Sequence, residues 1–194
     1  MILSAMRIIV VLVIAALAIG CGGRRTVSWK PVESVYKKHP QTAGLPASWF
    51  FLYDDKTATP LVLTRHGLYM DVIKITTEQE LPVKMQYTEL SINAGMQTYE
   101  VAEVVMNNFR VTPGVFDLLM EELAPAEIDG KEAFRLSLSY SLENGIRRRC
   151  LIFGIIHNGG KRYTEFAMYA HEDYYFDVVI EDFLGMVKKA AVSE

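Results

Sequence analysis

Residues 131–157 constrain the fold more than any other stretch, because two runs of alternating apolar and polar residues flank Asn144-Gly145. Asn-Gly between such runs is the strongest short-range signal for a β-hairpin, and it predicts a two-residue turn. Partners directly opposite each other share a sheet face, so this register predicts an apolar layer that packs on a C-terminal helix. The predicted partners are Leu142 and Arg147, Tyr140 and Arg149, Leu138 and Leu151, Leu136 and Phe153, and Phe134 and Ile155.

Three helices are predicted from apolar residues at helical spacing and from their capping residues. Thr112-Pro113 offers an N-cap and a first-turn proline for a helix over 114–123. Asp173 is the predicted cap of a helix over 173–190. The inward face of a helix over 98–109 comprises Val101, Val104, Val105 and Phe109, and that of the C-terminal helix comprises Phe176, Val179, Ile180, Phe183 and Val187.

The strands are predicted from β-rich runs between turn signals. One covers 48–53, two lie within 60–76 and turn at His66-Gly67, and three lie within 131–170, with a second turn at Asn158-Gly159-Gly160. Residues 26–48 contain three prolines and are expected to be mostly irregular. The sequence therefore predicts an α+β domain over residues 31–194, with an antiparallel sheet of about six strands flanked by helices.

This order of elements resembles the Mog1/PsbP-like fold, a three-layer α/β/α sandwich, over about residues 45–190. The resemblance rests on element order and involves no diagnostic motif. It implies accessory and binding roles rather than catalysis, although a fold alone does not fix a function.

The N-terminus has the pattern of a secretory signal peptide. Arg7 precedes an uncharged, mostly aliphatic stretch over 8–20, which ends in small residues. A helix of that length reaches only about 20 Å, which is short of a bilayer core of roughly 30 Å. The alternative is an uncleaved anchor that is lengthened by Leu3 and Ala5.

Ala18-Ile19-Gly20-Cys21 resembles the lipobox of bacterial lipoprotein precursors, with Ala18 where leucine is more usual. That resemblance implies cleavage between Gly20 and Cys21, a diacylglycerol on the Cys21 thiol and a further acyl chain, such as palmitate, on the new amino group. Each buried CH₂ contributes about 0.8 kcal/mol, so several chains on one residue anchor a protein durably. We therefore expect a cleaved signal peptide over 1–20 and a lipidated, flexible tether over 21–30.

The expected location is the periplasmic side of an outer membrane. Gly22 follows the lipidated cysteine, and it is not the aspartate that tends to retain lipoproteins at the inner membrane. Removal of Arg7 makes the mature chain one charge more negative than the formal −3 of the full sequence. An acidic domain offers no basic face for nucleic acid, so the expected partners are the membrane and an envelope protein or small ligand.

One sheet face of the predicted hairpin is a candidate binding face with small residues at its centre. It has two interpretations: a groove for a ligand or partner, or a face covered by the helix over 98–109. In either case Cys150 is expected to be central, buried and inert. The candidate residues are Arg135, Ser137, Ser139, Arg148, Gly154, Tyr163, Glu165 and Tyr169.

No motif for catalysis, a metal or a cofactor occurs in the sequence. We expect the four histidines, the acidic pairs Asp54-Asp55 and Glu121-Glu122, and the exposed hairpin end at Arg147–Arg149 to be solvated surface. The histidines are His39, His66, His157 and His171. The primary hypothesis is a non-enzymatic, lipid-anchored binding or accessory domain. The alternatives are a carrier of a small apolar molecule or lipid, held on the small-residue face, and an envelope hydrolase with dispersed site residues.

Overall fold

The computed structural model describes residues 28–32, 39–53, 60–190 and 192. The predicted signal peptide, the cleavage site at Gly20 and Cys21, most of the tether and the Asp54-Asp55 pair lie outside these residues. In the part of the chain that is described, no helix is long and apolar enough to cross a membrane.

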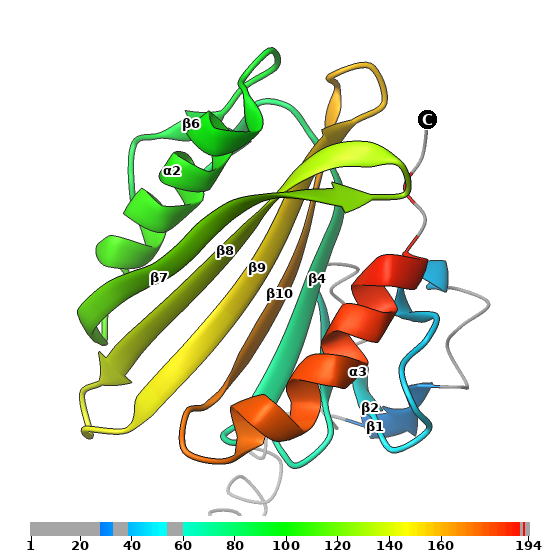
Figure 1. The fold of residues 1–194 in the computed structure, drawn as a ribbon, viewed down its shortest axis with the longest axis vertical. Coiled ribbons are helices and arrows are strands. Elements are labelled where there is room, and N and C mark those ends of the chain that lie inside the picture. The colour runs from blue at the N-terminus through cyan, green and yellow to red at the C-terminus, as the bar shows by residue number, and fades with distance from the viewer. Residues whose placement is uncertain (1–27, 33–38, 54–59, 191, 193–194) are drawn as a thin grey trace, which may run out of the picture.

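Eight strands form one antiparallel sheet in the order β1-β2-β3-β4-β10-β9-β8-β7 (Figure 1). Two short strands, β5 and β6, pair separately. The long central strands come from the predicted hairpin region and from β4, so the sequence segment 131–171 forms the middle of the molecule. The bounds are β1 Ser28–Pro31, β2 Phe50–Tyr53, β3 Leu61–Thr64, β4 Asp71–Glu80, β5 Val83–Lys84, β6 Ser91–Ile92, β7 Val115–Ile128, β8 Lys131–Leu142, β9 Arg147–His157 and β10 Arg162–His171.

Two helices pack on opposite faces of the large sheet and make a three-layer arrangement (Figure 1). Helix α2, Thr98–Arg110, buries its valines against Leu136 and Ile152 of the sheet. Helix α3, Tyr175–Lys189, buries Phe176, Val179, Phe183 and Val187 against the other face. The predicted α+β class with helix-flanked antiparallel strands is confirmed, and both helices have the predicted inward faces. The sheet has more strands than predicted, and β1 begins at Ser28, inside the segment assigned to the tether.

The predicted helix over 114–123 is wrong, because these residues begin the edge strand β7. The Thr112 hydroxyl donates to the carbonyl of Asn108, so it completes the end of α2 instead of capping a new helix. The strand pairs with β8 through two irregularities and carries Pro125, which an edge strand tolerates because one side of it makes no ladder bonds. The Thr112-Pro113 signal from which the helix was predicted therefore does not start a helix here.

The predicted two-residue turn is also wrong. The Leu142 N–H donates to the Ile146 carbonyl oxygen at 2.8 Å, and the three residues between Leu142 and Ile146 form the loop. Gly145 has a φ of 78°, and the Asn144 side chain accepts a hydrogen bond from the Ile146 N–H. A type I turn followed by a left-handed residue is the usual three-residue hairpin loop. The strands are therefore displaced by one residue from the predicted register, and Phe134 pairs with Gly154, Leu136 with Ile152, Leu138 with Cys150 and Tyr140 with Arg148.

The displaced register changes which side chains share a face. The leucines of β8 face α2 together with Cys150, Ile152 and Gly154, and not the C-terminal helix as predicted. The α3 side receives Leu151, Phe153 and Ile155 from β9. Asp173 does not cap α3, whose N-cap is Tyr174. Helix α2 begins with a capping box, in which the Gln97 and Glu100 side chains satisfy each other's backbone N–H groups.

Candidate functional site

The structure divides the candidate binding face between the two sides of the sheet, so the prediction that its residues lie together is wrong. Arg135, Ser137 and Ser139 lie on the α3 side, because the three-residue loop reverses the face of β8 relative to β9. Arg148, Gly154, Tyr163, Glu165 and Tyr169 share the α2 side, where β9 and β10 pair residue by residue. Helix α2 covers part of this side, as the second interpretation expected.

The residues on the α3 side are occupied by ion pairs. Arg135 pairs with Glu122 at 3.0 Å, and Arg149 pairs with Glu121 at 3.0 Å. The Ser137 hydroxyl also donates to Glu121. Burial tends to raise the pKa of Glu121, but the hydrogen bonds from Ser137 and Arg149 outweigh it and lower that pKa. The acidic pair is exposed, as expected, and both of its carboxylates are in addition ion-paired with arginines of the hairpin.

Gly154 is a packing position and not an open approach to the backbone. A Cβ atom there would lie 2.4 Å from the Phe134 ring and 2.8 Å from the Tyr163 hydroxyl oxygen. Ser137 and Ser139 are buried on the other face. The apolar-carrier alternative required an open face over these three residues, and the structure removes that support.

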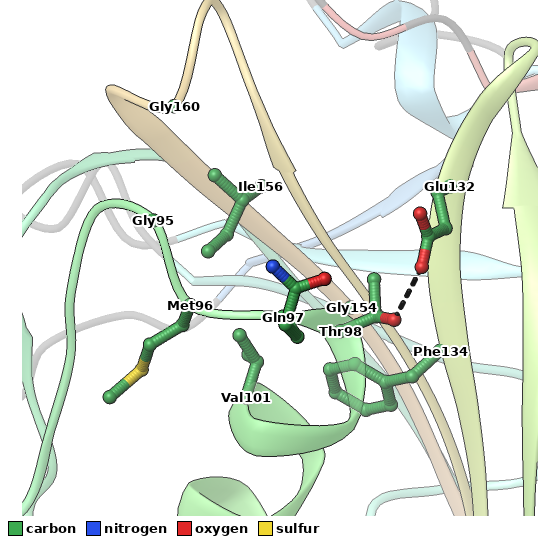
Figure 2. A pocket seen from close by; sticks show the side chains of 10 residues that line it. All are labelled: Gly95, Met96, Gln97, Thr98, Val101, Glu132, Phe134, Gly154, Ile156 and Gly160. Carbon is green, nitrogen blue, oxygen red and sulfur yellow. Dashed lines mark hydrogen bonds between the residues drawn. The ribbon is translucent and has the colours of Figure 1, made fainter.

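A cavity of about 310 Å³ lies at the start of α2, beside Phe134 and Gly154 (Figure 2). Its polar groups already have partners within the protein. The Thr98 hydroxyl donates to Glu132 at 2.7 Å, and Gln97 takes part in the helix cap. The cavity therefore offers a ligand few free hydrogen-bonding groups.

Two chambers with stronger chemistry lie beside the C-terminal half of α2, and together we call them the α2 groove. The Glu165 chamber measures about 200 Å³ and the Arg148 chamber about 440 Å³. Both are lined by Gln86, Asn108, Phe109 and Tyr169, so they adjoin each other. Their combined size falls within the range of roughly 300–1,000 Å³ that is usual for small-molecule sites.

The Glu165 chamber places a carboxyl group among tyrosines. The Tyr163 hydroxyl donates to Glu165 at 2.8 Å, and the Lys74 ammonium lies 5.2 Å from the centre of the Tyr169 ring. Burial raises the pKa of Glu165, and the Tyr163 hydrogen bond and Lys74 offset only part of this effect. Burial also raises the pKa of Tyr163 and of Tyr169. Groups with shifted pKa values in a cleft are typical of functional sites.

The Arg148 chamber combines aromatic walls with two cations. Arg148 lies opposite Tyr140 in the sheet, and both line the chamber with Lys74. Burial raises the pKa of Tyr140, while the neighbouring Arg148 guanidinium acts in the opposite direction. No acidic residue is among those that line this chamber. The other lining residues are Leu68, Val72, Gln86, Tyr87, Asn108, Phe109, Thr112, Pro113, Val115, Leu142 and Tyr169.

Sequence reasoning found Arg148, Tyr163, Glu165 and Tyr169 of this groove but missed Lys74 and the residues from α2. Lys74 gave a usable signal, because it interrupts the apolar β4 run between Ile73 and Ile75. Such a lysine must face solvent or a cleft. The contribution of Asn108 and Phe109 depends on how α2 crosses the sheet, which no local pattern contains.

The histidines are more structured than predicted, and none of them lines the three cavities above. His157 is buried, and its Nε2 lies 3.0 Å from the Thr164 hydroxyl, so its assignment to a solvated turn is wrong. His66 Nδ1 bonds to the buried carboxylate of Asp71. His171 Nδ1 lies 3.8 Å from Asp173 Oδ2. His39 stacks on Phe51.

Two further expectations concern Cys150 and metal ligands. Cys150 is fully buried as predicted, and burial raises the pKa of its thiol. The described residues contain no group of three or more His, Cys, Asp or Glu side chains that could hold a metal ion.

The chain matches no family model and no curated protein sequence. Solved structures do match. LpqN of Mycobacterium tuberculosis, a protein involved in cell envelope biogenesis, is 13% identical with a TM-score of 0.52, over 89% of this chain and 86% of LpqN. PA94 of Pseudomonas aeruginosa, a protein of unknown function, is 9% identical with a TM-score of 0.51, over 75% of this chain and 92% of PA94.

The solution structure of CyanoP, the cyanobacterial PsbP of Synechocystis sp. PCC 6803, is 17% identical with a TM-score of 0.49, over 90% of this chain and 96% of CyanoP. At such identities, the likeness to LpqN and PA94 shows a shared fold and no shared function.

Proposed function

We propose that this protein is a lipid-anchored lipoprotein of the bacterial cell envelope, whose domain binds a ligand or partner in the α2 groove and catalyses no reaction. The observation that carries the binding role is the groove itself. Two adjoining chambers bring Arg148, Lys74 and Glu165 together with several aromatic rings on one side of the sheet.

The anchor is supported by the sequence pattern that ends in Gly20-Cys21. The fold agrees with an envelope role at the level of architecture only, since LpqN, an envelope biogenesis protein, has it too. The expected location is the outer membrane, with the domain facing the periplasm. The β1 strand begins at Ser28, so the tether between the lipid and the sheet would be short.

The anchor is tested by Cys21→Ala, with membrane fractionation and metabolic labelling by palmitate. We expect the wild type to carry label and to sediment with outer-membrane vesicles, and the variant to lose both the label and durable membrane attachment. Gly22→Asp is the matched control, because it keeps Cys21 and is expected to change only the membrane in which the protein is retained. A Cys21→Ala protein that stays firmly membrane-bound would contradict the lipid anchor.

The binding role is tested by native mass spectrometry of residues 22–194, exported with a non-lipid signal peptide. We expect additional mass that survives gentle ionisation and disappears on denaturation. Gln86→Trp should abolish it, because Gln86 is exposed and lines both chambers, so a tryptophan there would obstruct both.

Glu89→Trp is the control for an added surface tryptophan, since Glu89 lies in the same loop and is exposed. A bare protein, or additional mass that Gln86→Trp leaves unchanged, would contradict binding in the groove.

A further inference from the structure

Arg148 differs from the other arginines of the described strands in how its charge is compensated. Arg135, Arg147, Arg149 and Arg162 each form an ion pair with a glutamate at between 2.8 and 3.1 Å. For Arg148 the structure gives a hydrogen bond to the Tyr69 carbonyl, and no acidic partner among the described residues. Its Nε–H is buried and has no hydrogen-bond partner, which is also true of the Nε–H of Arg135, so the difference between the two arginines is the missing acidic partner of Arg148 within the described part of the chain.

Lys74 supplies a second positive charge to the same chamber. It is exposed, and its ammonium lies against the face of the Tyr169 ring, with no ion pair at 4 Å or less among the described residues. Glu165 interacts electrostatically with Lys74, but it lies in the adjoining chamber and not in the lining of this one. The lining of the Arg148 chamber therefore contains two cationic side chains and no acidic one.

The walls of the chamber are suited to an apolar body. Tyr140 and Val72 are buried, and Phe109 packs edge-on against Tyr140 at 5.2 Å and stacks with Tyr169 at 6.1 Å. Leu68 and Tyr87 are exposed large apolar residues at the rim. Aromatic and aliphatic walls with a few well-placed charges are the usual composition of a small-ligand site.

We infer that the Arg148 chamber binds an amphipathic anion, meaning a carboxylate or phosphate group attached to an apolar body. This inference rests on the proposed binding function and assigns its ligand class. The anionic group accepts hydrogen bonds from the terminal N–H groups of the Arg148 guanidinium and lies near Lys74. The apolar body lies against Tyr140, Phe109 and Tyr169. Arginine suits both head groups because its donors form a planar fork.

The test measures equilibrium binding of four probes to the full-length lipidated protein in neutral phosphatidylcholine nanodiscs, with empty nanodiscs as background. The probes are 4-phenylbutyrate, 4-phenylbutyl phosphate, the neutral 4-phenylbutanol and inorganic phosphate. We expect the two amphipathic anions to bind at least about tenfold more tightly than the alcohol, since a charge-assisted hydrogen bond is lost with the neutral group. Inorganic phosphate should bind weakly, because it lacks the apolar body.

Arg148→Gln should reduce binding of both amphipathic anions about tenfold and leave binding of 4-phenylbutanol unchanged. Lys74→Gln should act in the same direction, and Arg148→Lys should retain part of the binding. Arg135→Gln is the matched control, because it removes a strand arginine on the opposite face. Thermal melting of each variant, followed by circular dichroism, tests whether a loss of binding is caused by a loss of folding. If Arg148→Gln unfolds, Arg148→Lys is used in its place.

The two proposals fail in different ways. Equal binding of 4-phenylbutanol and 4-phenylbutyrate, abolished by Gln86→Trp, would overturn the anion inference and leave the groove as a binding site. Equal effects of Arg148→Gln and Arg135→Gln would also overturn it. Binding of inorganic phosphate as tightly as the amphipathic anions would show that the apolar walls play no part. If no probe binds and the mass spectrum is bare, both proposals are wrong.

Discussion

Replacement of Gly154 by alanine should destabilise the protein, because the space that the new methyl group needs is already filled. A Cβ atom at this position would lie 2.4 and 2.5 Å from two atoms of the Phe134 ring. Carbon atoms pack at about 3.5–4.0 Å, so the ring would have to move by about 1 Å. Phe134 is only 2% exposed and cannot swing into solvent. Overpacking of this kind costs about 1–3 kcal/mol of the free energy of unfolding.

The assay is urea unfolding followed by circular dichroism, with thermal melting as a second measure. A loss of 1–3 kcal/mol lowers Tm by about 2–12 °C in a chain of this size. Gly185→Ala is the matched control: nothing lies within 4 Å of its Cβ position, in the interior of α3. That change should stabilise the protein by about 0.5–1 kcal/mol, because alanine is the better helix former.

The double variant Gly154→Ala with Phe134→Leu identifies the cause. Leucine removes the ring atoms that the new methyl group would contact, so the cost of Gly154→Ala should shrink in the Phe134→Leu background. Unchanged stability of Gly154→Ala, or a cost that is the same with and without the Phe134 ring, would refute the packing argument at Gly154.

Three further predictions concern buried polar groups. Glu165→Gln should stabilise the protein at pH 8 but not at pH 4. The pKa of Glu165 in the folded state is raised above 4.5, so the wild type loses stability as the pH rises from near 4.5 through that folded-state pKa. Glutamine does not titrate, so the variant does not have this loss. Urea unfolding at both pH values measures this, and an equal gain at each would contradict it. Asp71→Asn should cost about 1.5–3 kcal/mol, because the buried carboxylate accepts hydrogen bonds from Thr64 and His66; an unchanged urea midpoint would show that these bonds contribute little. Cys150 should react with Ellman's reagent only after unfolding, because its thiol is buried and the thiolate is the reactive form; rapid reaction of the native protein would contradict the burial.

The type and order of the central elements could be predicted, because periodicity and turn residues agreed there. The helix over 98–109, the strands around Asn144-Gly145 and the C-terminal helix all occur in the structure. Residues 114–123 were predicted as a helix from the capping signal at Thr112-Pro113, whereas Thr112 completes the end of α2 and the residues after it begin the edge strand β7, whose exposed positions include several apolar residues. Such a strand has no clean alternation, since neither of its faces is uniformly buried.

The hairpin register could not be predicted from hydrophobicity. Strand β9 is buried and apolar at every position from Cys150 to Ile155, so either register gives β8 an apolar partner. A pattern specifies register only when one face of the strand is polar. The register is set by the loop instead. Asn-Gly is found in two-residue turns and also in three-residue loops, in which the glycine takes the left-handed conformation, as Gly145 does here. The candidate face was divided between two sides of the sheet for this reason.

The same loop decides what surrounds Arg148. With a two-residue turn, Arg148 would lie opposite Ser141, among the polar residues of β8. With the observed loop it lies opposite Tyr140, and the apolar side of β8 packs on the valines of α2. An arginine among serines at a hairpin end needs no partner other than water. Arg148 instead lies beside aromatic rings, with the Tyr69 carbonyl as a hydrogen-bond partner and no acidic side chain among the described residues to pair with its charge. If only the stability of the fold mattered, we would expect either an apolar residue at position 148 or a glutamate next to Arg148. Arg147 and Arg149 each have such a glutamate partner. The placement is therefore better explained by an anion that arrives from outside the chain than by the stability of the sheet.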